Sequence, residues 1–375
     1  MKTPYYICKE ELLERNLKLL DDVQKRSGAK IILALKGFAM WSSFELCSKY
    51  LKGCTASGLH EARLAREEFC KYNPHAEVHT YSPAFNDDDI KEIAKISDHV
   101  VFNTPSQLFR HVGNVKKINP HAKVSLRINP EVSSSPKDIY NPCAIYSRLG
   151  TTLAHFDENI LEHIEGLNFH ALCEQNVNAL EEVLKTFEQN FSKYFKNLKF
   201  INFGGGHHIT KKGYDVEKLI WIIKDFRQKY GVEVYLEPGE AVGWEVGDLV
   251  CSVLDIFHNG MDIAILDTSA ETHMPDTLAM PYRAEIEGAG EAGEKKHTYR
   301  LGGNTCLAGD IMGDYSFNES LKVGDKIVFK DQIHYTFVKN TTFNGIQLPS
   351  IVYEKKDGSR VVKEFGYEDY KGRLS

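Results

Sequence analysis

The stretch IILALK, residues 31–36, decides the fold prediction, because five consecutive apolar residues end in a single lysine. Strands without polar alternation are typical of parallel sheets that are covered on both faces. Seven further runs follow, with helical stretches between them: GCTAS (53–57), VHTYS (78–82), HVVFNT (99–104), VSLRINP (124–130), LNFHALC (167–173), FINFGGG (200–206) and VYLEPG (234–239). This alternation predicts an α/β fold, an eight-stranded (β/α)8 barrel, with a doubly wound open sheet as the alternative.

The alternation of strands and helices ends near residue 240. The runs after it are short, β-branched and separated by turn residues: RAEIEG (283–288), DKIVFKDQIHYTFV (325–338) and SIVYEKKDGSRVVKEF (350–365). We therefore expect a barrel over residues 12–240 and a second, mostly antiparallel β domain over residues 241–375. Residues 1–11 precede the first helix, and we expect them to add a strand to the second domain.

Composition and charge narrow the classes of partner. The net charge of −6 is spread along the chain without a basic block, which argues against a nucleic-acid partner. No window approaches a membrane span and the N-terminus lacks a signal-peptide core, so we expect a cytoplasmic protein without membrane contact. The eight cysteines include no CxxC pair and no zinc-site spacing, so we expect no metal site and mostly reduced, buried thiols.

Polar residues and a run of glycines gather where the predicted barrel strands end, which is where barrel enzymes build their active sites. They are Lys36, Ser57, Arg127, Asn129, His170, Gly204, Gly205, Gly206 and Glu237. Lys36 follows five apolar residues, so partial desolvation should lower the pKa of its amine and make it a nucleophile that forms Schiff bases with aldehydes. A lysine that extends from the barrel rim into solvent would fit the same pattern.

The other strand ends suit an aromatic phosphate ligand. Consecutive glycines at 204–206 expose backbone N–H groups to an anion, although they also suit a tight turn. Glu237 is placed to pair with a protonated pyridine nitrogen, or to cap a helix. His170 is placed to stack on a flat ring, and Arg127 to orient His170 or Glu237; both also suit a structural role.

Five motifs carry a resemblance to a known family: ALKGF (34–38), ASGLHEA (56–62), FHALC (169–173), NFGGG (202–206) and LEPGE (236–240). In order and spacing they resemble the fold-type III pyridoxal-phosphate (PLP) enzymes, the superfamily of alanine racemase and the ornithine and diaminopimelate decarboxylases. The resemblance implies an alanine racemase-like PLP-binding barrel. It assigns Lys36 to the Schiff base, His170 to ring stacking, the three glycines to the phosphate and Glu237 to the pyridine nitrogen. Ser57 and Arg127 join them as cofactor-binding residues.

Two C-terminal segments favour the decarboxylase branch. GGNTCLAGD (302–310) resembles the decarboxylase box, whose cysteine reaches the active site of a neighbouring subunit. HYTFVKNTTFNGIQLP (334–349) resembles the segment whose tyrosine, here Tyr335, touches the PLP phosphate. The resemblance therefore implies a homodimer with shared active sites, in which Cys306 donates a proton to the product.

One position departs from the family pattern and points to the substrate. Family decarboxylases usually carry arginine directly after EPG, whereas this chain has Glu240. Carboxylates suit a cationic substrate, because a buried ammonium group needs anionic partners. SRLG (147–150) and DTSAETHMPDTLAMPYR (267–283) resemble the carboxynorspermidine/carboxyspermidine decarboxylases. That resemblance implies that Glu240 and Asp276 bind the distal amines of a polyamine-type substrate, with His273 and Asp310 as further candidates.

The sequence therefore predicts PLP-dependent decarboxylation of carboxynorspermidine, carboxyspermidine or both, to norspermidine and spermidine in polyamine biosynthesis. Decarboxylation of diaminopimelate or another basic amino acid is the first alternative. Amino-acid racemisation is a second, which the cysteine box opposes. A non-catalytic PLP-binding regulator is a third, and the additional β domain opposes it.

Overall fold

The computed structural model describes residues 1–133, 135 and 138–375 of the chain. Backbone contacts divide it into two compact units. One comprises residues 14–242, and the other combines residues 1–13 with residues 243–375. Each boundary lies two residues beyond the position expected from the sequence. Within the described ranges, none of the helices combines the length and apolarity that a membrane crossing requires.

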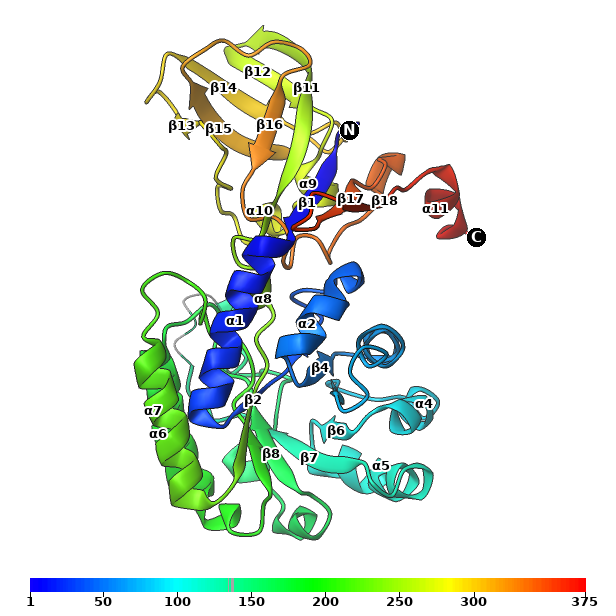
Figure 1. Ribbon diagram of the computed structural model, residues 1–375, viewed down its shortest axis with the longest axis vertical. Coiled ribbons are helices and arrows are strands. Elements are labelled where there is room, and N and C mark those ends of the chain that lie inside the picture. Colours follow the sequence, from blue (N-terminus) through cyan, green and yellow to red (C-terminus); the bar gives the residue numbers. More distant parts are fainter. Residues whose placement is uncertain (134, 136–137) are drawn as a thin grey trace. The chain divides into compact units, whose positions relative to one another are not determined.

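The first unit is a closed parallel barrel (Figure 1). Its strands are β2 (Lys30–Ile31), β3 (Leu33–Ala34), β4 (Gly53–Ala56), β5 (Glu77–Tyr81), β6 (His99–Phe102), β7 (Lys123–Ile128), β8 (Gly166–Phe169), β9 (Phe200–Asn202) and β10 (Glu233–Leu236). β2 and β3 are two halves of one strand: β2 pairs with β10 and β3 pairs with β4. Because this split strand joins both edges of the sheet, the predicted eight-stranded barrel is confirmed and the open sheet is excluded.

One helix, α1 (Glu10–Ser27), precedes the first barrel strand. The others follow barrel strands: α2 (Phe44–Tyr50), α3 (Leu59–Leu64), α4 (Asp89–Ile96), α5 (Pro105–Ile118), α6 (Val177–Phe195), α7 (Val216–Tyr230) and α8 (Glu240–Gly243). Their ends follow from local sequence. Thr104 caps α5 by accepting the N–H of Gln107, and Pro105 occupies the first turn, where no N–H is needed. Gly231 ends α7 in the left-handed conformation, which glycine adopts without a steric cost.

The second unit is a mixed β-sheet with three short helices (Figure 1). Its elements are β1 (Tyr5–Lys9), β11 (Gly247–Asn259), β12 (Met261–Leu266), β13 (Gly290–Glu291), β14 (His297–Gly302), β15 (Ile311–Phe317), β16 (Lys326–Phe329), β17 (Ser350–Glu354), β18 (Arg360–Lys363), α9 (Ala270–His273), α10 (Asp276–Ala279) and α11 (Tyr367–Gly372). β1 lies between β11 and β17, antiparallel to the first and parallel to the second. The N-terminal segment is therefore part of this sheet.

Two strand predictions for the second unit were wrong. RAEIEG (283–288) forms no strand and contributes only an isolated bridge between Ile286 and Phe329. The run 325–338 is a strand only at its start, because the backbone turns at Asp331, whose φ is 58°.

β15 was missed, since its glycine and aspartate interrupt the apolar alternation. An ion pair between Asp314 and Arg300 of β14, whose nitrogen and oxygen lie 2.8 Å apart, supports β15 instead.

A polar cluster is buried where two neighbouring barrel strands begin. The rings of His79 and His99 stack with centroids 3.7 Å apart and planes 12° apart. The carboxylate of Glu77 lies 3.1 Å from His79 Nε2, and Tyr235 donates its hydroxyl to the same oxygen. These side chains lie close enough to ligate one ion, but an ion cannot lie in two stacked, nearly parallel ring planes at once. The arrangement is therefore one of stacked imidazoles beside a carboxylate, not the geometry of a metal site.

This cluster predicts a loss of barrel stability in acid. Burial lowers the pKa of His99 well below its ordinary value, the neighbouring His79 adds to the effect, and Glu77 opposes it. Below about pH 6.5, His99 therefore binds a proton in the unfolded chain but not in the folded chain. The free energy of unfolding falls as the pH drops through this range. His99→Phe should flatten this slope by up to about 1.4 kcal/mol per pH unit, measured by urea unfolding between pH 5 and pH 7.5. The same substitution at the exposed His121 should change nothing. An unchanged slope in His99→Phe would contradict the prediction.

Candidate active site

Lys36 stands two residues beyond the end of β3, at the end of the barrel where all the parallel strands finish. Its side chain is solvent-accessible but surrounded by protein atoms, and this desolvation lowers the pKa of the amine. The positive charge of Arg127 lowers it further, whereas Glu237 and Glu61 act in the opposite direction. Lys36 therefore has the environment of a nucleophilic amine, as we predicted from the apolar strand before it.

His170 follows β8 and is held in one orientation by two backbone groups. Its Nδ1 accepts the N–H of Gly205 at 3.1 Å, and its carbonyl accepts a guanidinium N–H of Arg127 at 3.1 Å. Burial lowers the pKa of His170 well below its ordinary value, with Lys36 and Arg127 adding to the effect. The ring is therefore neutral, with Nδ1 as acceptor, which is the state suited to covering an aromatic ligand.

The glycine loop after β9 is pressed against its neighbours so closely that no side chain fits. A Cβ on Gly204 would lie 2.3 Å from the carbonyl oxygen of Phe169, and one on Gly206 would lie 2.1 Å from that of Leu172. Both residues also have positive φ. Across the described residues, no acceptor binds the N–H of Gly206 or of His207. Two such donors in a glycine turn are the arrangement that phosphate groups occupy in proteins.

Glu237 lies just beyond β10, half-buried and beside the glycine loop. Its Oε1 accepts the side-chain amide of Asn202 at 2.7 Å, and its backbone N–H donates to the carbonyl of Gly204. Asn202 is a functional candidate that the sequence analysis missed. The residue lies within the quoted NFGGG motif, but an amide side chain carries no reactive group that would single it out.

Arg127 and Ser57 occupy the strand ends predicted for them. Arg127 of β7 is buried and packs its guanidinium over the ring of Tyr81, 4.6 Å from the centroid. Ser57 is exposed after β4, and its backbone N–H donates to Glu61 at 2.6 Å. Glu61 in turn acts on the charge of Lys36. Their roles in cofactor binding stay predictions.

Glu240 has a histidine partner that the sequence analysis did not identify. Its Oε2 lies 3.0 Å from Nε2 of His208, and both side chains are largely buried. Glu174, which follows β8, brings a second carboxylate, and one potential ligand atom from each of the three residues lies within 4.8 Å of the others. The cluster places two carboxylates beside the glycine loop.

The candidates in the β domain divide into two groups, and the first is buried. Asp310 is buried, and its carboxylate accepts hydrogen bonds from the N–H of Ala270 and from both the N–H and the hydroxyl of Thr305. His273 is completely buried, its Nδ1 lies 2.9 Å from the hydroxyl of Thr268, and burial lowers its pKa to about 4. The assignment of Asp310 and His273 as substrate ligands stays a prediction.

The second group is accessible. Cys306 is exposed, and its backbone N–H donates to the side chain of Asn344 at 2.8 Å. Asp276 forms an ion pair with Lys339, its Oδ1 lying 2.6 Å from the ammonium nitrogen. Tyr335 is half-buried. Their functional assignments stay predictions.

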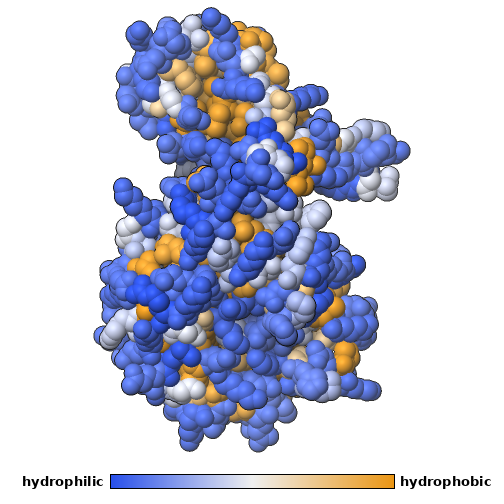
Figure 2. Space-filling model, viewed as in Figure 1, coloured by the Kyte–Doolittle hydropathy of each residue, from blue (hydrophilic) through white to orange (hydrophobic). Residues whose placement is uncertain are grey.

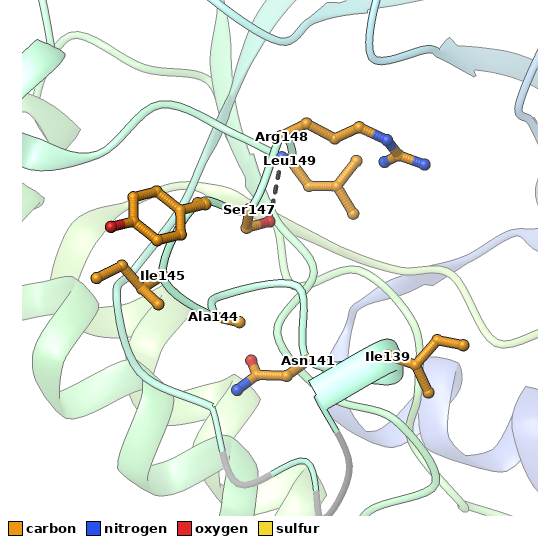
Figure 3. A pocket seen from close by; sticks show the side chains of 8 residues that line it. Ile139, Asn141, Ala144, Ile145, Ser147, Arg148 and Leu149 are labelled. Atoms are coloured by element: carbon orange, nitrogen blue, oxygen red, sulfur yellow. Dashed lines mark hydrogen bonds between the residues drawn. The ribbon is translucent and has the colours of Figure 1, made fainter.

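A cavity of about 640 Å³ lies within the connection from β7 to β8. Its walls include the exposed apolar side chains of Ile139, Ile145 and Tyr146, and the hydroxyl of Ser147 accepts the N–H of Leu149 (Figure 3). None of the predicted site residues lines it. The chemistry therefore belongs to the strand ends around Lys36, not to this cavity.

The sequence model of a pyridoxal-dependent decarboxylase family, described for its C-terminal sheet domain, matches residues 6–332. The chain belongs to the pyridoxal-dependent decarboxylase family. The carboxynorspermidine/carboxyspermidine decarboxylase of Campylobacter jejuni is 53% identical, over 99% of this chain and 98% of that protein. The carboxyaminopropylagmatine decarboxylase of a Synechocystis species is 41% identical, over 100% and 96%.

Solved structures agree with this membership. The carboxynorspermidine decarboxylase of Campylobacter jejuni, crystallised with norspermidine, matches with a TM-score of 0.91 and 51% identity over the whole of both chains. The diaminopimelate decarboxylase of Helicobacter pylori matches with a TM-score of 0.81 at 17% identity, over 100% of this chain and 97% of that one, which shows the common fold.

The barrel residues of this pyridoxal-dependent decarboxylase fit its cofactor, pyridoxal 5'-phosphate. A desolvated amine at Lys36 suits the aldehyde, and the glycine loop offers N–H donors to the phosphate. The neutral ring of His170 suits the face of the pyridine, and the carboxylate of Glu237 suits its nitrogen. The donor set therefore matches the aldehyde, the phosphate, the ring face and the ring nitrogen of the cofactor.

Lys36→Ala should abolish covalent attachment of the cofactor, because no other candidate site residue is an amine. Borohydride reduction followed by peptide mass spectrometry should place the cofactor on Lys36 in the wild type and on no residue in the variant. The exposed Lys49→Ala serves as a matched control and should be labelled like the wild type. A label on another lysine in the wild type would refute the assignment.

Proposed function

We propose that this enzyme decarboxylates carboxynorspermidine, carboxyspermidine or both, to norspermidine and spermidine. The observation that carries the proposal is the 53% identity, over almost the whole chain, to a relative with that named activity. The barrel site supports it, since an amine, a phosphate loop, a stacking ring and a carboxylate converge at the strand ends.

PLP supplies an electron sink for the carbanion that is left when carbon dioxide departs. Lys36 provides the amine that holds the aldehyde between turnovers. Glu237 would accept a hydrogen bond from the protonated ring nitrogen and keep that nitrogen charged. His170 would cover one ring face without adding charge. The N–H groups after Gly205 bind the phosphate. Each residue then performs one task, and only Lys36 must exchange a covalent bond.

The distal end of the substrate is a polycation, and we assign its recognition to Glu240 and Asp276. Glu240 and Glu174 together place two carboxylates within reach of one ammonium group, with His208 between them as a hydrogen-bonding partner. Asp276 forms an ion pair with the ammonium of Lys339, which supports its assignment to an amine. Buried cations need partners of this kind, so carboxylates at these positions favour an amine tail over a carboxylate tail.

A second candidate substrate has a guanidinium tail. The Synechocystis relative, at 41% identity over the full chain, is named a carboxyaminopropylagmatine decarboxylase. Paired carboxylates bind a planar guanidinium as well as an ammonium group, so the acidic cluster alone does not separate the two. The higher identity to the Campylobacter relative favours the amine tail.

Steady-state kinetics on four substrates test the proposal. We expect kcat/KM for carboxynorspermidine or carboxyspermidine to exceed that for diaminopimelate by at least about 100-fold, because a distal carboxylate would meet buried acids. Carboxyaminopropylagmatine should rank between them. In the same assay, Glu240→Gln should raise KM for the polyamine acids and leave PLP affinity unchanged. A preference for diaminopimelate, or no carbon dioxide release from any substrate, would contradict the proposal.

We further propose a cytoplasmic homodimer in which Cys306 of one chain completes the active site of the other. Cys306 is exposed on its own chain, in a loop anchored by Asp310 and Asn344, so its thiol is presented outward on a fixed backbone. The β domain that carries this loop also exposes apolar side chains, including Leu254 and Phe257. Figure 2 shows apolar residues gathered on the visible face of this domain. All eight cysteines are free, which suits a reducing compartment.

Mixing two inactive variants tests the shared site. Lys36→Ala and Cys306→Ala should each lose nearly all activity, and their co-refolded mixture should regain roughly a quarter of the wild-type value, because half the dimers carry one intact site of two. Mixing either variant with the Lys36→Ala/Cys306→Ala double variant should restore nothing. If the first mixture stays inactive while mixed dimers form, Cys306 does not cross the interface.

A further inference from the structure

Asn202 is the last residue of β9 and the point where the two ends of the cofactor site are joined. It is 1% exposed, so each of its polar atoms needs a protein partner. Its Oδ1 accepts the N–H of Gly204 at 2.8 Å, and its Nδ2 donates to Oε1 of Glu237 at 2.7 Å. One side chain therefore links the start of the phosphate loop to the carboxylate assigned to the ring nitrogen.

The direction of both hydrogen bonds is fixed by chemistry. The backbone N–H of Gly204 can only donate, so the side-chain oxygen of Asn202 must face it. The amide nitrogen must then face Glu237, and because this group also can only donate, Oε1 of Glu237 must act as an acceptor. The carboxylate is fixed in orientation, and its other oxygen is left for the cofactor.

We infer that Asn202 is a positioning residue that holds Oε1 of Glu237 as a hydrogen-bond acceptor and fixes the carboxyl group relative to the phosphate loop. The inference rests on the proposed function only in assigning Glu237 to the ring nitrogen. An amide at this position does not titrate, so the link between the two residues needs no proton of its own. An aspartate of the same shape would need one, because two carboxylates in contact share a proton.

A purely structural role for Asn202 makes a different prediction. If the residue only supported the backbone of the loop, then Asn202→Asp would be harmless, since an aspartate oxygen accepts the N–H of Gly204 equally well. The amide nitrogen matters only if the state of Glu237 matters. The isosteric aspartate therefore separates positioning of Glu237 from support of the loop.

The test follows PLP affinity and kcat of Asn202→Asp from pH 6 to pH 9. At low pH the shared proton is present, and both quantities should lie within about 3-fold of the wild type. The proton is lost as pH rises, and repulsion between the two carboxylates should then displace Glu237. We expect PLP affinity at least about 10-fold below the wild type at pH 9, and a descending limb of kcat at lower pH than in the wild type. Profiles that superimpose on the wild type would overturn the inference, and so would an equal loss at every pH.

A double variant keeps the test decisive if Asn202→Asp folds poorly. In Asn202→Asp/Glu237→Gln, the donor and acceptor are exchanged, so the hydrogen bond between the side chains is restored without a second carboxylate. Its melting temperature should return to the wild-type value and its PLP affinity should follow the pH profile of the wild type, while kcat stays at least about 10-fold low for want of charge at position 237. A PLP affinity that falls more steeply than that of the wild type between pH 6 and pH 9 in this double variant would refute the inference. PLP titration of the apoenzyme needs no substrate, so an error in the proposed substrate would leave this result unaffected.

Discussion

The site depends on the seam where the first and last barrel strands meet. The N–H of Ile32 donates to Leu236 and that of Ala34 donates to Pro238, which closes the sheet on itself. Beyond the seam the two chains converge further, because a Cβ on Gly37 would lie 2.8 Å from the Cα of Gly239. Only glycines allow this approach. Closure thereby brings two residues that are two hundred positions apart in sequence, Lys36 and Glu237, to the same end of the barrel.

Around this seam, the orientation of the reactive groups is set by hydrogen bonds that run in one direction only. Gly205 donates to His170, Gly204 donates to Asn202, and Asn202 donates to Glu237. None of these donors loses its proton in the working pH range, so the network does not rearrange when pH changes. Preorganisation of this kind lets a site stabilise charge without first reorienting its own dipoles. In the proposed mechanism, only Lys36 and the proton donor gain or lose a proton.

The sequence predicted the part of this arrangement that repeats along the chain. Eight apolar runs defined the barrel strands, and the residues at their ends, such as Lys36 and Glu237, followed from the rule that barrel sites form there. RAEIEG and β15 were misjudged because short strands of a mixed sheet are set by their partners, as the pairing of Arg300 with Asp314 shows.

Other features of the site depend on hydrogen-bond partners that a strand-end rule does not predict. Asp310 and His273 have the side chains expected of substrate ligands, and the fold brings them into contact with Thr305 and Thr268 of their own loops. Asn202 was passed over, since it bears no reactive group and matters only through its neighbours. A strand-end position predicts where a side chain lies, but its role depends on which hydrogen-bond partners the fold brings to it.

The replacement of the family's arginine by Glu240 shows how the site tolerates a change of charge. A carboxylate near a phosphate loop would repel the anion if it were unpaired. Here Oε2 of Glu240 lies 3.0 Å from Nε2 of His208, so the carboxylate has a polar partner. In the proposed site the glycine loop binds the phosphate through backbone N–H groups, which no side-chain substitution removes. In the proposed site, glycine backbone holds the phosphate, so the residue after EPG is free to serve the substrate. There, an acid at that position favours the cationic tail of a polyamine acid over the carboxylate tail of a dicarboxylic amino acid, with little effect on cofactor binding.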